Sequence, residues 1–459
     1  MPANSVVFIL NAHLPFVRHP EYPRFLEEDW LFESISESYL PLLRMFNKLK
    51  ADKVPFKFTI SLSPTLCCML ADPVLQERFV QYEERLIELG EKEVERCGNE
   101  QPEFLEMAQF YLGQAKQNLS DYQDLYRTNI LDGFKALETS GHLELVTTAA
   151  THAYLPLYTE YPTAINAQIE LGVQSFLTTF GHLPKGFWLP ECGYYPALEE
   201  NLKYHGISWF QTASQSMLLS PDKVQYGNYR PVRCPNGVAA FPRDFQGTSL
   251  VWSNTSGYPT DKAYREFYRD IGYDLPMEYI KPYIHEPSVR VFTGYKYWAI
   301  TGHTDQKVPY QRSEAQKRVV EHAHNFIYNL KKKGRQLSSA MGVAPLFTLA
   351  YDAELFGHWW FEGIEWLDQV IRLAAKESEE ISLVTPSLFL SKEGTSLQTA
   401  RPAFSSWGQG GYSAVWLDGS NAWTYRHIHK AIERMEELAV RFNDQISLKQ
   451  RFLNQAARE

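Results

Sequence analysis

The sequence has few cysteines and no long apolar run. Its cysteines are five in 459 residues, and none forms a Cys-x-x-Cys pair. An odd number of isolated thiols fits a reducing compartment better than a disulfide framework or a zinc ribbon. No stretch approaches the roughly 20 apolar residues that span a bilayer, and the first residues lack the basic start of a signal peptide. We therefore expect a cytoplasmic protein that does not enter a membrane.

The chain also lacks an excess of basic residues. It carries 45 Lys and Arg against 54 Asp and Glu, a formal net charge of −9. Binding to nucleic acid needs a basic surface that neutralises phosphates, so we expect no nucleic-acid partner. A P-loop and a Gly-x-Gly-x-x-Gly motif after a strand are absent as well, which argues against a nucleotide cofactor.

What the sequence does have is an ordinary globular composition with many aromatic residues. Apolar residues make up 44%, charged residues 22% and aromatic residues 14%. Such a chain buries a core large enough to hold a preorganised site. Aromatic faces suit planar or sugar-ring ligands, although most aromatic side chains simply fill cores.

Short, nearly continuous apolar runs alternate with longer helical patterns. This alternation predicts parallel strands buried on both faces, and hence an α/β barrel or a doubly wound sheet. The predicted strands are Ser5–Leu10, Phe56–Leu62, Leu143–Thr148, Gly186–Leu189, Ile207–Phe210 and Leu346–Ala350.

Two regions depart from this alternation. From about residue 73 to 137 the apolar spacing is helical, which predicts a helical insertion after the second strand. After about residue 385 the strand patterns stop and a charged helical run closes the chain. We therefore predict a catalytic barrel over 1–385, with the insertion at about 73–137, and a C-terminal helical domain over 386–459.

Polar residues follow several of the predicted strands directly. Asn11 and His13 follow the first, His152 the third, Glu191 the fourth and Asp352 the sixth. In parallel barrels the carboxyl ends of the strands meet at the active site. Two imidazoles and two carboxylates are thus predicted to face one place.

Two carboxylates are what retaining glycoside chemistry needs, one as nucleophile and one as general acid. Each residue alone has a simpler explanation. Glu191 alone is more often a surface residue, Asp352 alone is able to cap the following helix, and His152 alone fits a core histidine. Their joint placement after successive strands favours a shared site.

At these residues the sequence resembles the glycoside hydrolase family 57 enzymes, and among them the 1,4-α-glucan branching enzymes. Trp188-Leu-Pro-Glu191-Cys-Gly-Tyr194 is similar to the family's nucleophile segment. The segment from Asp352 to Gly363, which contains His358, is similar to its acid/base segment. Further similar stretches include Tyr264-Arg-Glu-Phe-Tyr-Arg-Asp-Ile-Gly-Tyr-Asp274.

The resemblance implies a fold and roles for individual residues. The fold is an α/β, (β/α)7 incomplete barrel with a helical insertion and a C-terminal helical domain. Glu191 would be the nucleophile and Asp352 the general acid/base. The implied substrate-binding residues are Asn11, His13, Trp30, His152, His358, Trp407 and Trp416. For Trp30 and Trp407 a place in the core is the alternative.

The sequence departs from the family pattern in places. Asn11 stands where the family usually has a histidine, and Phe210-Gln-Thr-Ala-Ser-Gln215 lacks the Asp and His common there. Branching enzymes use a loop tyrosine to favour transfer over hydrolysis. Tyr226 and Tyr229 are the candidates here.

The resemblance therefore implies a retaining enzyme that cleaves an α-1,4 glucan and transfers the chain to a 6-hydroxyl. Amylose, glycogen or a starch-like glucan is the expected substrate, no metal or cofactor is needed, and the chain is expected to be a monomer or homodimer. Three alternatives stay open: an α-amylase or 4-α-glucanotransferase, a metal-dependent sugar hydrolase, and a non-catalytic glucan-binding protein. The reaction products distinguish an α-amylase or 4-α-glucanotransferase, because only branching creates new α-1,6 linkages. A tightly bound metal would indicate the metal-dependent hydrolase, and glucan binding without turnover would indicate the binding protein.

Overall fold

The computed structural model describes residues 4–253, 255–286, 288–302, 304, 306–442, 447–449, 451 and 453. The chain forms two compact units, each built from separate stretches of sequence. The first unit comprises Met1–Val146 and Arg243–Ser396, and the second comprises Thr147–Pro242 and Leu397–Glu459. Strand β3 (Leu143–Thr148) belongs to both units: its first residues pair with β2 of the first unit, and Thr147 and Thr148 pair with β4 of the second.

The first unit is built on a parallel sheet. Its strands are β1 (Asn4–Ala12), β2 (Phe58–Leu62), β8 (Leu346–Asp352) and β9 (Ile381–Leu383), with the start of β3. β1 lies between β2 and β8, and β2 pairs with β3 on its other side. Side chains from Val6 to Leu10 are fully buried, as the continuous apolar run predicts for a strand covered on both faces.

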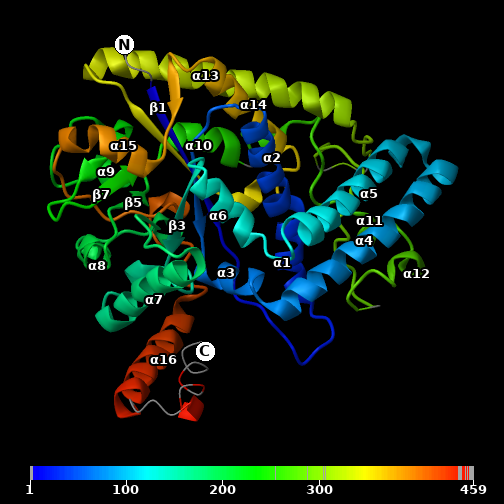
Figure 1. Ribbon diagram of the computed structural model, residues 1–459, viewed down its shortest axis with the longest axis horizontal. Helices are drawn as coiled ribbons and strands as arrows, with labels where there is room; N and C mark the ends of the chain where they lie inside the picture. Colours follow the sequence, from blue (N-terminus) through cyan, green and yellow to red (C-terminus); the bar gives the residue numbers. More distant parts are fainter. Residues whose placement is uncertain are drawn as a thin grey trace. The chain divides into compact units, whose positions relative to one another are not determined.

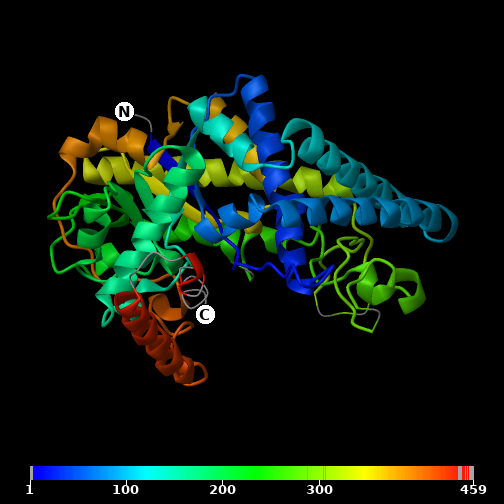
Figure 2. The ribbon, with the colours of Figure 1, turned by 60° about the horizontal axis from the view of Figure 1, so that its bottom comes forward.

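Helices surround this sheet and extend from it (Figure 1). They are α1 (Asp29–Ser34), α2 (Leu40–Ala51), α3 (Pro64–Leu70), α4 (Pro73–Glu100), α5 (Leu105–Ser120), α6 (Leu131–Thr139), α10 (Phe245–Trp252), α11 (Ile271–Asp274), α12 (Met277–Ile280), α13 (Arg312–Met341), α14 (Gly363–Lys376) and α15 (Pro386–Glu393). The region predicted to be a helical insertion holds α4, α5 and α6, and α4 and α5 run side by side in both views (Figure 2). Asp72 caps α4 by accepting from the backbone N–H of Val74 at 2.9 Å.

One turn between α1 and α2 is a π-helix, η2 (Ile35–Tyr39). The helical path continues through it, so the extra residue rotates the side chains that follow. Such turns are frequent at functional sites. Here the turn carries Glu37, which contacts His358, and Tyr39, which contacts Glu354.

The second unit contains the end of β3 and four further strands. These are β4 (Gly186–Trp188), β5 (Trp209–Thr212), β6 (Val232–Arg233) and β7 (Ala239–Pro242), in the order β3-β4-β5-β7-β6. All pairs are parallel except that of β6 with β7. The helices are α7 (Pro162–Phe180), α8 (Leu198–Tyr204), α9 (Gln215–Leu218) and α16 (Ala422–Arg441).

All six predicted strands are present, and the three that were missed are short. β6, β7 and β9 have two, four and three residues. Their length alone does not explain the omission, because β4 and β5 are as short as β9 and β7 and were predicted. β5 begins at Trp209, two residues later than predicted. Its indole lies so close to Gly186 that a Cβ there would meet the ring at 2.2 Å, so this pairing requires glycine. The predicted boundary between a barrel over 1–385 and a helical domain over 386–459 stays a prediction.

Within the described residues, no helix is both long enough and apolar enough to cross a membrane.

Several carboxyl groups of the first unit are buried and hold their protons. Burial raises the pKa of Glu83 on α4 to about 8, and neither of its carboxyl oxygens has a hydrogen-bond partner among the described residues. Burial likewise raises the pKa of Glu354 to about 8 and that of Glu362 to about 7. In the unfolded chain these groups ionise near the ordinary value of 4.5.

The free energy of unfolding is therefore expected to fall as pH rises from about 5 to 8. Between the two pKa values the folded chain holds protons that the unfolded chain has released, and each such group contributes about −1.4 kcal/mol per pH unit. Glu83→Gln should make the fall less steep by that amount. Denaturant unfolding at pH 5, 6 and 7 measures it, with the exposed neighbour Glu84→Gln as control. Equal slopes for wild type and Glu83→Gln would contradict a buried, protonated Glu83.

Candidate active site

In the first unit, Asp352 lies at the carboxyl end of β8, beside Asn11 at the end of β1. The strand register pairs these two residues directly. Asn11 donates from Nδ2 to Asp352 Oδ1 at 3.4 Å. Within the described residues 352–356, the Asp352 side chain makes no capping bond, so the helix-cap explanation for it is wrong. An amide in place of the family's histidine thus still bonds the predicted acid/base.

A second carboxyl, Glu354, supports this end of the sheet and was not predicted. It is buried, and its Oε1 accepts from the backbone N–H of His13 at 3.2 Å and from the hydroxyl of Tyr39. Burial and the charge of Asp352 raise its pKa, which keeps it protonated near neutral pH. Glu354 thereby joins β1, β8 and the π-helical turn without adding a charge beside Asp352.

His358 is held rigidly a few residues further along the chain. Its Nδ1 lies 2.6 Å from Oε2 of Glu37, which comes from the same π-helical turn, and its ring meets the edge of Phe267. Trp359, also missed by sequence reasoning, is 54% exposed and stacks on Phe267 with ring centroids 4.6 Å apart. Trp30 on α1 is 49% exposed, so the core alternative for it is wrong. Both indoles offer a face to a ligand.

In the second unit, Glu191 follows β4 in a strained backbone conformation. Its φ of 59° and ψ of 22° lie in the left-handed region, where a residue with a side chain pays about 1–3 kcal/mol. The neighbouring segment holds it there, because the backbone N–H of Trp407 donates to the Glu191 carbonyl at 2.9 Å. Backbone strain of this kind persists only where the surrounding structure holds the residue in place, and it is concentrated at active sites and ligand-binding sites.

The carboxylate of Glu191 has a partner on each oxygen. The indole Nε1 of Trp407 donates to Oε2 at 2.5 Å, and His152 Nε2 lies 3.7 Å from Oε1. His152 itself has a positive φ of 56° and contacts the hydroxyl of Thr148 at 3.4 Å. His152 is therefore aimed at Glu191 and not merely packed in the core. Trp407 holds the predicted nucleophile directly, a role that the sequence did not indicate.

Tyr154 and Trp416 lie in the same unit and close to this carboxylate's segment. The Tyr154 hydroxyl lies 2.8 Å from Oγ of Ser413, and its ring centroid lies 6.0 Å from that of Trp416. A Cβ on Gly193, two residues after Glu191, would meet the Tyr154 ring at 2.5 Å. The segment that carries Glu191 can pass Tyr154 only because this residue is glycine.

Two glutamines occupy the stretch where the family's Asp and His are missing. The side-chain amides of both form hydrogen bonds with backbone groups. Gln211 on β5 pairs with Leu189 through both ends of its amide, at 3.0 and 3.1 Å. Gln215 donates to the carbonyls of Ser406 and Gly411 at 2.5 and 2.6 Å. These amides fix the segments that carry Glu191 and Trp407, which gives this stretch a positioning role.

The remaining predicted residues keep their status. Tyr226 and Tyr229 flank a short turn before β6, where both are half-buried, and their role in favouring transfer stays a prediction. Among the described residues, no three His, Cys, Asp or Glu side chains are grouped so as to hold a metal ion.

Replacing Trp407 by Phe removes one donor from Glu191 and keeps an aromatic ring. A hydrogen bond to a charged group is worth roughly 1.5–3 kcal/mol, so we expect kcat to fall about 10- to 100-fold. The control is Trp423→Phe, an exposed indole that donates to the Ser420 carbonyl. Unchanged kcat in Trp407→Phe, measured on amylose, would show that this bond does not serve the reaction.

Comparisons with known proteins show the family to which the chain belongs. Residues 7–399 match the glycosyl hydrolase family 57. The chain is 32% identical to a 1,4-alpha-glucan branching enzyme of Thermococcus kodakarensis, over 99% of this chain and 67% of that one.

Two solved structures are similar over nearly the whole chain. An alpha-amylase from Thermotoga maritima is 43% identical with a TM-score of 0.90, covering 99% of this chain and 85% of its own. A branching enzyme of the same family from Pyrococcus horikoshii is 33% identical with a TM-score of 0.86, covering 98% and 82%. The predicted α/β fold of the (β/α)7 type with helical additions is confirmed. The chain therefore belongs to glycosyl hydrolase family 57 and is an enzyme.

Proposed function

We propose that this enzyme cleaves α-1,4 linkages of a glucan and transfers the released chain to a 6-hydroxyl, which forms an α-1,6 branch. The observation that carries the proposal is the strained Glu191, fixed by Trp407 and faced by His152. Similarity to branching enzymes over 98–99% of the chain supports the choice of reaction. The enzyme would then serve the synthesis of a glycogen-like polysaccharide in the cytoplasm.

In the first step Glu191 is the nucleophile. Its carboxylate attacks the anomeric carbon of an internal glucose unit while Asp352, in its protonated form, gives its proton to the departing O4. The C1–O4 bond breaks, a C1–O bond to Glu191 forms, and the configuration at C1 inverts. His152 and Asn11 are the polar partners of the two carboxyl groups.

In the second step the 6-hydroxyl oxygen of the acceptor chain replaces Glu191 on the anomeric carbon. Asp352, now a carboxylate, takes the proton of the 6-hydroxyl, and the oxygen attacks C1 of the glycosyl-enzyme. The second inversion restores the α configuration and frees Glu191. Water in place of the acceptor gives hydrolysis, so the same groups support an amylase.

Incubation with amylose tests the proposal. Loss of iodine staining with few new reducing ends, and with new chains released by isoamylase, is the expected result. Reducing ends that rise in step with lost staining, without isoamylase-sensitive branches, would overturn branching.

Hydrolysis is the second candidate because the chain is 43% identical to an alpha-amylase. Tyr226 and Tyr229 are our candidates for the loop tyrosine that excludes water. An amylase outcome would leave the roles of Glu191 and Asp352 unchanged and would show that neither tyrosine performs this exclusion.

A further inference from the structure

Trp359 presents an exposed aromatic ring on the loop that follows Asp352. Its side chain is 54% exposed, whereas tryptophan is highly buried on average. The loop is tied to the end of the sheet, because the backbone N–H of Trp359 donates to the Glu354 carbonyl at 3.2 Å. The Glu354 carboxyl in turn accepts from the backbone N–H of His13, directly after β1. Loops in this position build the active sites of (β/α) barrels, so the indole lies where a substrate is expected.

The indole is supported by a second aromatic ring. Trp359 stacks on Phe267, with ring centroids 4.6 Å apart and an angle of 24° between the planes. The ring of His358 meets the edge of Phe267 at 5.5 Å, and that of Tyr268 meets it at 5.1 Å. Since Phe267 covers one face of the indole, we expect the exposed area of Trp359 to lie on the other face.

Phe267 is itself held in place by a buried ion pair. The Lys296 ammonium lies 5.0 Å from the centre of the Phe267 ring and 3.8 Å from that of Phe292, where the ring electrons attract a cation. Its Nζ also lies 3.2 Å from Oδ2 of Asp270, and both residues are buried. Asp270 accepts in addition from the backbone N–H of Thr293 at 2.9 Å. These contacts fix Phe267 independently of the loop that carries Trp359.

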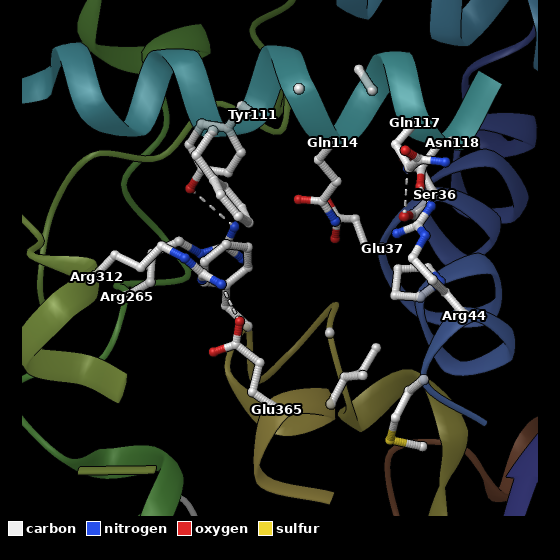
Figure 3. A pocket seen from close by; sticks show the side chains of 18 of the residues that line it. Ser36, Glu37, Arg44, Tyr111, Gln114, Gln117, Asn118, Arg265, Arg312 and Glu365 are labelled. Atoms are coloured by element: carbon white, nitrogen blue, oxygen red, sulfur yellow. Dashed lines mark hydrogen bonds and ion pairs between the residues drawn. The ribbon is translucent and has the colours of Figure 1, made fainter. Parts of the chain in front are cut away.

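The neighbouring His358 is held by Glu37. The Nδ1 atom of His358 lies 2.6 Å from Oε2 of Glu37, which lines a cavity together with Arg265 (Figure 3). Burial favours the neutral form of Glu37, but His358 and then Arg265 and Lys296 outweigh it and hold the pKa of this carboxyl below its usual value. The carboxylate is therefore ionised near neutral pH, which strengthens its contact with His358. Trp359 and its support are thus preorganised, and little order has to be gained when a ligand binds.

A fixed and exposed indole suits a sugar ring. One face of glucose consists of C–H groups, which pack against an aromatic face, while the hydroxyls at the rim stay in contact with water. A single exposed aromatic residue is common on protein surfaces and by itself indicates no ligand. Trp359 differs because its ring is stacked on a fixed partner and its loop begins at the predicted acid/base.

The place of Trp359 indicates which part of a glucan it contacts. In the proposed reaction Asp352 gives a proton to O4 of the leaving chain and later takes one from the 6-hydroxyl of the acceptor. Both chains therefore occupy the Asp352 side of the cleaved bond in turn. We expect the loop that begins at Asp352 to contact them, and Trp359 is the exposed indole of that loop.

We propose that Trp359, backed by Phe267, is the subsite for glucose units of the leaving chain and then of the acceptor chain. The identity of the sugar rests on the proposed function, whereas the place of the subsite rests on the loop that joins Trp359 to the end of β8. An acceptor held there favours attack by its 6-hydroxyl over attack by water. Trp359 therefore raises the ratio of transfer to hydrolysis.

Two donors separate this subsite from the rest of the enzyme. Amylose has glucose units on the leaving side of the cleaved bond, whereas α-maltosyl fluoride has only fluoride there. For Trp359→Ala we expect kcat/KM on amylose to fall at least tenfold, and the number of isoamylase-released chains per new reducing end to fall at least tenfold as well. The kcat/KM for fluoride release should stay within twofold of wild type, which also shows that the variant is folded.

A second variant and a matched control accompany this change. Phe267→Leu removes the stacking partner of the indole and should lower both amylose values about threefold, with fluoride release retained. The control is Trp252→Ala, an exposed indole at the end of α10 in the same unit, which should match wild type on both donors. Wild-type values on amylose in Trp359→Ala and Phe267→Leu would overturn the proposal. Equal losses on both donors in both variants would overturn it too, because the leaving side would not be the part affected.

The two proposals fail separately. Should wild type give no isoamylase-released chains, branching is wrong, and the subsite is judged by kcat/KM on amylose against that on the fluoride. Should wild type branch and Trp359→Ala keep wild-type values, the subsite is wrong and branching is untouched.

Discussion

Glu191→Gln is expected to abolish turnover of amylose while the chain folds normally. Gln has the same shape and accepts the Trp407 bond, but it cannot form a stable ester with the anomeric carbon. The loss should be roughly six orders of magnitude, as when a nucleophile that forms a bond to the substrate is removed. Iodine staining and reducing-end assays measure the rate, and far-UV circular dichroism checks the fold.

The matched control is Glu200→Gln, an exposed carboxylate on α8 of the same unit. It should keep wild-type activity. A further test is rescue of Glu191→Gly by azide, a small nucleophile that takes the vacated place and gives a glycosyl azide of inverted configuration. More than a few per cent of residual activity in Glu191→Gln would show that another group is the nucleophile.

Asp352→Asn is expected to lower the rate on amylose roughly a thousandfold, in keeping with the 10²–10⁴-fold contribution of general acid–base catalysis. Asn still accepts the Asn11 bond at the end of β8, but it has no proton to give to O4. The first step should survive on an α-maltosyl fluoride, because fluoride leaves without a proton. Asp132→Asn, exposed on α6, is the matched control.

The two substrates separate catalysis from damage. A misfolded variant loses both activities, whereas the proposed role predicts loss on amylose with a retained burst of about one fluoride per enzyme, because the second step lacks its base. Absence of this burst in a folded Asp352→Asn would contradict the acid/base assignment.

Much of the fold was predictable from the sequence, because the residue patterns that indicate its strands lie within short segments. Strands that are buried on both faces are largely apolar, so β1 and β8 are visible as nearly continuous runs. The two-residue strand β6 shows no pattern, because so few residues pair only where tertiary contacts place them. Glu191 and Asp352 were predicted as site residues because both directly follow predicted strands.

The support around these residues was not predictable. Tyr39 meets Glu354 across 315 positions of sequence, through a π-helical turn that no composition signal marks. The indole bond from Trp407 to Glu191 spans 216 positions. Trp359 is another case, because its stacking on Phe267 is a property of packing alone. Long-range contacts decide what a side chain does, and one sequence does not contain them in readable form.

Trapping the covalent intermediate tests the central claim most directly. Asp352→Asn incubated with α-maltosyl fluoride should form the glycosyl-enzyme faster than it can release it, because the second step lacks its base. Mass spectrometry of a peptic digest is expected to find a maltosyl group on the peptide that contains Glu191. The double variant Glu191→Gln/Asp352→Asn should show no such group. Fluoride release without any adduct, or an adduct on another peptide, would contradict Glu191 as the nucleophile.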